Sequence, residues 1–109
     1  MKLNDLLNDL QQACIELNSQ VHFNEIDSDY FYILESDSIL IKNYYFTVRF
    51  TSLKAWTDVE LSIHASYDLD WDDEKIYTKT LHDVELMDWI RIMEFIDKKI
   101  NQYIDFKLD

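Results

Sequence analysis

The chain has 109 residues with neither glycine nor proline, and 22 acidic against 10 basic residues give it a net charge of −12. Without glycine it cannot contain a phosphate-cradling P-loop, a dinucleotide-binding fingerprint or a G-x-S-x-G nucleophile elbow. The surplus of negative charge argues against direct binding to nucleic acid or to an anionic membrane, and it favours a basic partner protein.

The composition is that of a single globular domain covering residues 1–109. Hydrophobic residues make up 48% and aromatic residues 15% of the chain, which is enough to build a core. Cys14 is the one cysteine, so an internal disulfide is excluded. The sequence has no signal-peptide pattern and no apolar run long enough to span a bilayer. We therefore expect a cytoplasmic protein. The composition, rich in Lys, Asn, Ile and Asp, is typical of an AT-rich coding source, so we expect the host cell to be bacterial and the gene to be bacterial or phage-encoded. No cofactor is predicted.

Residues 3–18 are predicted to form an amphipathic helix. Apolar side chains recur there at steps of three and four residues, which places them along one stripe. The stripe consists of Leu3, Leu6, Leu7, Leu10, Ala13, Cys14 and Leu17. Because Cys14 lies on it and no cationic group is nearby in the sequence, we expect a buried and unreactive thiol.

The middle of the chain has the two-residue period of antiparallel strands. We expect strands at residues 21–23, 30–34, 39–51, 59–67 and 75–80, with a polar turn at residues 35–38. The alternation is cleanest in residues 59–67. There the odd positions are apolar or aromatic and the even positions are polar.

Residues 81–106 are predicted to form a second, long helix with Thr80 as its N-terminal cap. Its apolar stripe is widened by Ile92, Phe95 and Phe106. Either the helix packs between the sheet and the first helix, or the extra apolar residues form a face for self-association or for a partner. We expect a monomer or a weak homodimer. The resulting fold class is α+β, with two layers: an N-terminal helix, an antiparallel sheet of three to five strands, and a long C-terminal helix packed on the sheet.

Acidic residues are concentrated in residues 58–88, which hold ten acids and two lysines, whereas residues 39–57 hold no acid. Asp68, Asp70 and Asp72 begin like an EF-hand loop. The match then fails, because Asp73 stands where the loop needs glycine and Lys79 stands where it needs glutamate. The three histidines have no zinc-ligand spacing, so we predict no metal site.

Ser62, His64 and Asp68 have the residue types of a hydrolytic triad. They alternate along one predicted strand, which sets neighbouring members about 6.6 Å apart. A nucleophile and its base must lie about 3 Å apart. The spacing therefore argues against a triad made from this strand, and we expect the histidines to be exposed or to lie at helix ends. No catalytic residue is predicted, and the protein is not expected to be an enzyme.

The acidic run is either a solubilising loop or a binding surface for a basic partner. Trp71 favours binding, because tryptophan is a frequent anchor of protein interfaces. The carboxylates also alternate at roughly 6–7 Å, a spacing of the same order as that of phosphates on a nucleic-acid strand. The predicted partner-binding residues are Asp58, Glu60, Asp68, Asp70, Trp71, Asp72, Asp73 and Glu74.

In size, charge and element order the chain resembles phage-encoded inhibitors of bacterial defence, including anti-CRISPR proteins and other DNA mimics. This resemblance implies a non-enzymatic inhibitor that docks on a nucleic-acid-binding protein or nuclease and blocks its DNA or RNA site. Two alternatives stay open. One is an immunity protein or antitoxin that neutralises a basic nuclease toxin, and the other is a small assembly protein that pairs through its C-terminal helix.

Overall fold

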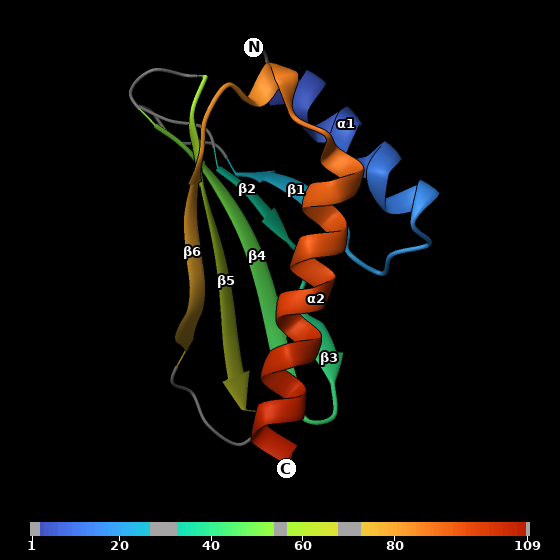
Figure 1. The fold of residues 1–109 in the computed structure, drawn as a ribbon, viewed down its shortest axis with the longest axis vertical. Helices are drawn as coiled ribbons and strands as arrows, with labels where there is room; N and C mark the ends of the chain where they lie inside the picture. Colours follow the sequence, from blue (N-terminus) through green and yellow to red (C-terminus); the bar gives the residue numbers. More distant parts are fainter. Residues whose placement is uncertain (1–2, 27–32, 54–56, 68–72, 109) are drawn as a thin grey trace.

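The computed structural model describes residues 3–26, 33–53, 57–67 and 73–108. It confirms the α+β class, with a helix at each end of the chain and an antiparallel sheet between them (Figure 1). The elements follow one another as α1 (Leu3–Glu16), β1 (Phe23–Ile26), β2 (Ile33–Ser36), β3 (Ile39–Ile41), β4 (Tyr44–Ser52), β5 (Val59–Tyr67), β6 (Glu74–Leu81), the short 3₁₀ helix η1 (Val84–Leu86) and α2 (Trp89–Leu108).

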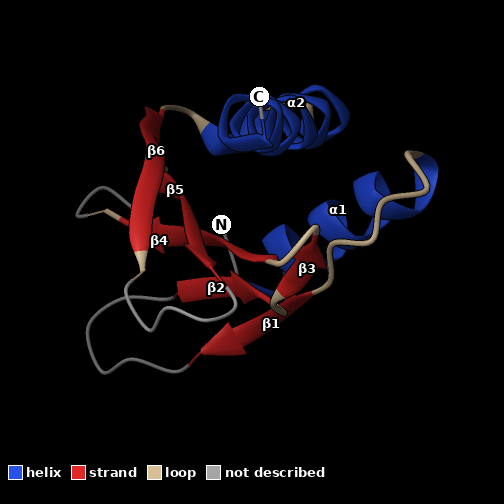
Figure 2. Cartoon of the chain, turned by 90° about the horizontal axis from the view of Figure 1, so that it is seen from below, coloured by secondary structure: helices blue, strands red, loops and turns tan. Residues whose placement is uncertain are grey.

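The sheet is antiparallel throughout and has the strand order β1-β2-β4-β5-β6. Strand β4 is its centre. It pairs with β5 along its whole length on one side, while β2 and β3 share its other side. Both helices lie on the same face of the sheet (Figure 2), and α1 packs against α2 and β1. This is the predicted two-layer arrangement.

The core lies between the sheet and the helices, where the two apolar periodicities meet. Strands β4 and β5 send every second side chain toward the helices, and the helices bury the stripes that their sequences predict. The fully buried members with the largest side chains are Phe46, Phe50, Leu6, Leu10, Leu34, Leu61, Ile63, Met93 and Ile96. Cys14 is buried, as predicted. Its burial raises the pKa of the thiol, and the nearby Asp97 carboxylate raises it further.

The described part of the sheet has six strands rather than three to five, because the long strand predicted at residues 39–51 is two strands. Lys42 and Asn43 form a two-residue turn between β3 and β4, with φ angles of 51° and 73°. Both angles are left-handed, as a tight hairpin turn of the type usually built from Asn-Gly requires. Since this chain has no glycine, the sequence does not mark the turn in the usual way.

The second helix begins later than predicted, and Thr80 is not its cap. Residues 80 and 81 belong to β6, where Leu81 pairs with Val59 and is buried in the core. The chain then turns through Asp83, whose φ is 53°, and α2 starts at Trp89. Asp88 caps it, because its Oδ1 accepts a hydrogen bond from the Arg91 backbone N–H at 3.3 Å. Neither described helix is long and apolar enough to cross a membrane.

Candidate binding site

The predicted acidic positions fall into separate places. Asp68, Asp70, Trp71 and Asp72 lie outside the described residues. Asp58 precedes β5, whereas Asp73 and Glu74 stand at the start of β6, which pairs with the far end of β5. Six residues of strand separate the two ends, or about 20 Å. The described acids therefore do not form one compact cluster.

Each of the four described acids has a partner within the chain. Asp58 lies 3.1 Å from the Nδ1 of His82, and Glu60 lies 3.7 Å from the Nζ of Lys75. The Tyr103 hydroxyl donates a hydrogen bond of 3.1 Å to Glu74. Asp73 contacts His64 and keeps 58% of its side chain exposed. The Glu60–Lys75 pair is exposed on both sides, so it costs little to open and Glu60 can exchange it for a partner's cation. Asp58 is less accessible, with 26% of its side chain exposed.

Asp73, His64 and Ser62 form a chain of side-chain contacts, called the relay below. It corrects the expectation that all three histidines are exposed or lie at helix ends, because the His64 side chain is only 12% exposed. His64 Nε2 lies 3.1 Å from Ser62 Oγ, and His64 Nδ1 lies 3.2 Å from Asp73 Oδ2. The imidazole is long enough to bridge alternate positions of the strand, and it is largely buried rather than exposed. Ser62 is only 4% exposed. The relay therefore holds Asp73 against β5 and gives a substrate little access to the serine hydroxyl.

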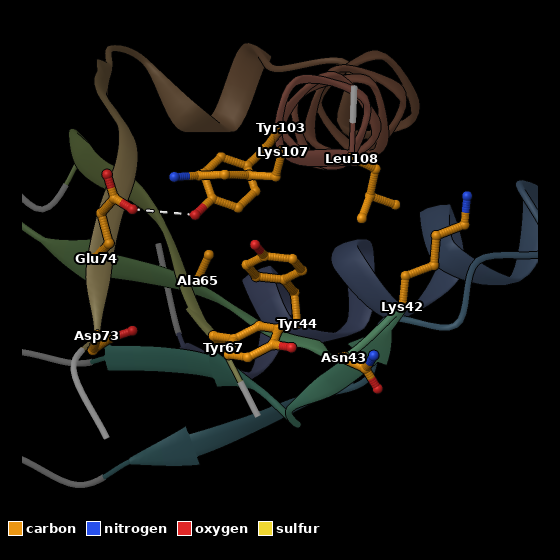
Figure 3. Close-up of a pocket in the computed structure, with 10 residues that line it drawn as sticks. All are labelled: Lys42, Asn43, Tyr44, Ala65, Tyr67, Asp73, Glu74, Tyr103, Lys107 and Leu108. Atoms are coloured by element: carbon orange, nitrogen blue, oxygen red, sulfur yellow. Dashed lines mark hydrogen bonds between the residues drawn. The ribbon is translucent and has the colours of Figure 1, made fainter. Parts of the chain in front are cut away.

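A pocket of about 540 Å³ opens beside Asp73 and Glu74 (Figure 3). The turn between β3 and β4, the adjoining ends of β5 and β6, and the last turns of α2 surround it. Three tyrosines from three different elements line it: Tyr44, Tyr67 and Tyr103. Two of the sequence-predicted residues thus share a cavity with aromatic rings that the sequence analysis did not single out.

The three rings form one cluster. The centroid of Tyr44 lies 5.2 Å from that of Tyr67 and 5.6 Å from that of Tyr103, which it meets edge to face. Burial, the hydrogen bond to Glu74 and the negative charge of that carboxylate raise the pKa of Tyr103 to about 12. Its hydroxyl therefore stays neutral at physiological pH and continues to donate to Glu74.

Two lysines also reach the pocket from opposite sides. Lys107 comes from the last turn of α2, and its Nζ lies 5.5 Å from the centroid of Tyr103. Lys42 belongs to the left-handed turn before β4. In Figure 3 the two ammonium groups point away from each other, and that of Lys107 points to the side on which Glu74 lies.

Sequence reasoning missed the pocket because each of its aromatic residues fits a predicted apolar stripe. Tyr44 and Tyr67 continue the alternation of their strands, and Tyr103 continues the stripe of the last helix. The sequence signal that could have identified these tyrosines is their position, because all three stand near the end of a strand or helix. Tyrosine at such places commonly buries its ring and keeps its hydroxyl at a polar boundary.

No family model, curated protein or solved structure matches the chain. Among the described residues no group of three or more histidine, cysteine, aspartate or glutamate side chains could hold a metal ion. The candidate site consists of the predicted acidic positions together with the tyrosine pocket that adjoins Asp73 and Glu74.

Proposed function

We propose that the protein is a non-enzymatic inhibitor whose acidic surface docks on a basic nucleic-acid-binding protein and blocks its DNA or RNA site. The docking surface comprises the sequence-predicted positions from Asp58 to Glu74. Carboxylates on this surface take the place of phosphates, so that the partner's lysines and arginines bind the protein instead of nucleic acid.

The observation that carries the proposal is the charge balance around the β5–β6 hairpin. Within residues 57–67 and 73–88 stand seven acids and two lysines. At the far end of this stretch, Leu86 is 87% exposed between Glu85 and Met87. An exposed leucine among carboxylates gives a partner an apolar contact within a negative field, and buried apolar contacts hold interfaces that charges first bring together.

The proposal is tested by capture of binding proteins from a nuclease-treated bacterial lysate on the immobilised protein. We expect basic nucleic-acid-binding proteins, released by duplex DNA and by raising NaCl from about 50 to about 500 mM, because salt screens exposed charge pairs. Binding that is unchanged over this range, or capture of proteins without a nucleic-acid site, would contradict the proposal.

A matched pair of variants locates the surface. One variant carries Asp68→Asn, Asp70→Asn and Asp72→Asn. The control variant carries Asp5→Asn, Asp9→Asn and Glu16→Gln on α1, where all three side chains are exposed. Both lose three negative charges, so any general effect of net charge is the same. We expect the first variant to bind the captured protein much more weakly than the second. Equal affinities would assign the acidic run to solubility alone.

Two other functions stay as candidates. An immunity protein or antitoxin would use the same electrostatics, and a nuclease toxin among the captured proteins would identify it. An assembly protein is favoured by Phe106 and Leu108, which are 75% and 53% exposed at the end of α2. A tight dimer in solution that Phe106→Ser dissociates would support assembly.

A further inference from the structure

We propose that the tyrosine pocket receives the guanidinium group of an arginine from the basic partner. The nature of the partner rests on the proposed function, whereas the nature of the bound group rests on the pocket alone. An arginine at a nucleic-acid site stacks on bases and pairs with phosphates. Here Tyr44, Tyr67 and Tyr103 provide the stacking, and Asp73 and Glu74 provide the negative charge.

The first argument is the combination of aromatic rings with carboxylates at one cavity. Aromatic faces attract cations, and a planar guanidinium stacks on a ring while its N–H groups bind a carboxylate. Glu74 already accepts a hydrogen bond of 3.1 Å from the Tyr103 hydroxyl, which joins its carboxylate directly to the ring cluster. Asp73 also lines the pocket, but its Oδ2 lies 3.2 Å from His64 Nδ1, on the face of β5 opposite to Ala65. Glu74 is therefore the carboxylate that faces the rings.

The second argument is that the chain already places a cation there. Lys107 Nζ lies 5.5 Å from the Tyr103 centroid, within the range of a cation–π contact. Lys107 is exposed on the last turn of α2, and its side chain can swing away into solvent. It therefore occupies part of the site in the free protein and competes with an incoming arginine.

An anion is the main alternative occupant, since Lys42 and Lys107 both line the pocket. The ammonium groups point to opposite sides (Figure 3), so they do not converge on one acceptor. Glu74 lies on the β6 side of the pocket, beside the Tyr103 hydroxyl, and would repel an anion there. The geometry favours a cation that enters on the β6 side.

The test uses capped single residues and needs no partner protein. Acetyl-arginine methylamide, its neutral citrulline analogue and inorganic phosphate are each titrated into the full chain and followed by NMR. We expect the arginine probe to shift the ring resonances of Tyr44, Tyr67 and Tyr103 at concentrations on the order of 10 mM, as befits one side chain. Tyr45, on the other face of β4, serves as the internal reference.

Two variants give results of opposite sign for a cation and an anion, and a third is their control. Glu74→Gln is expected to weaken arginine binding about two- to fivefold, because it removes one exposed charge pair. Lys107→Met is expected to strengthen it by a similar factor, because the competing cation is gone. Asp5→Asn removes the same charge as Glu74→Gln at a distant exposed site and is expected to change nothing. The amide spectrum of each variant checks its fold.

The inference is overturned if phosphate shifts the rings and arginine does not, if citrulline binds as well as arginine, if Lys107→Met weakens binding, or if no probe shifts the rings. It fails separately from the proposed function. Arginine binding without capture of a basic protein supports the pocket and rejects the function. Capture that Glu74→Gln and Lys107→Met leave unchanged supports the function and rejects the pocket as its anchor.

Discussion

The turn between β3 and β4 is expected to be a place where the protein can be made more stable. Lys42 and Asn43 have φ angles of 51° and 73°, and a left-handed conformation costs an ordinary residue roughly 1–2 kcal/mol. Asparagine tolerates this conformation better than lysine, and glycine tolerates it without strain. Asn-Gly is also the preferred pair for a two-residue hairpin turn.

We therefore expect the double variant Lys42→Asn, Asn43→Gly to raise the free energy of unfolding by about 1 kcal/mol. The relief of strain at both positions is partly offset by the greater freedom that glycine gives to the unfolded chain. For a domain of this size a gain of about 1 kcal/mol raises Tm by roughly 4–8 °C. The m value is expected to stay unchanged, because the turn is exposed in both states.

Urea unfolding followed by circular dichroism measures this difference. The control is Asn101→Gly, the same substitution at an exposed position inside α2, where glycine is expected to lower stability by a few tenths of a kcal/mol. A double variant that is no more stable than the parent would refute the reasoning. It would mean that the contacts of the Lys42 side chain outweigh the strain in the backbone.

Three further results are expected. Glu74→Gln should lower the pKa of Tyr103 from about 12, measured by NMR of the ring carbons. In the parent protein the neutral Tyr103 hydroxyl should contribute to the free energy of unfolding below pH 10, and this contribution should be lost as pH rises toward 12. Burial raises the pKa of Asp97, so Asp97→Asn should stabilise the fold at neutral pH in thermal unfolding and lose this advantage below the ordinary pKa of an aspartate. The Cys14 thiol should react with Ellman's reagent much more slowly in the folded protein than in urea, and its pKa should fall in the Asp97→Asn variant.

The fold was predictable to the extent that periodicity determines it. The stripe that includes Leu6 and Leu10 defines α1, and the alternation along residues 59–67 defines β5 and its buried face. Periodicity did not predict where one strand or helix ends and the next begins. Asp83 and the Lys42–Asn43 turn bend the chain with left-handed residues other than glycine, and nothing in the local hydrophobic pattern marks them.

The candidate site was less predictable than the fold. Asp73 and Glu74 were found from the density of charge, which is a property of the local sequence. Their neighbours Tyr44 and Tyr103 come from distant segments, and only the pairing of β4 with β5 and the packing of α2 bring them together. The contact of His64 with Ser62 and Asp73 was missed because the prediction compared backbone spacings and ignored the reach of the imidazole ring.

The connectivity of the sheet has a consequence for the order of folding. Four of the five described strand pairings join strands that follow one another in the chain, and only the β2–β4 pairing passes over a strand. Such local pairings close short loops and are typical of fast folding. The contact between α1 and α2, in contrast, joins the two ends of the chain. This long-range contact is therefore expected to form late, so a variant that weakens it should chiefly speed unfolding and leave the folding rate nearly unchanged.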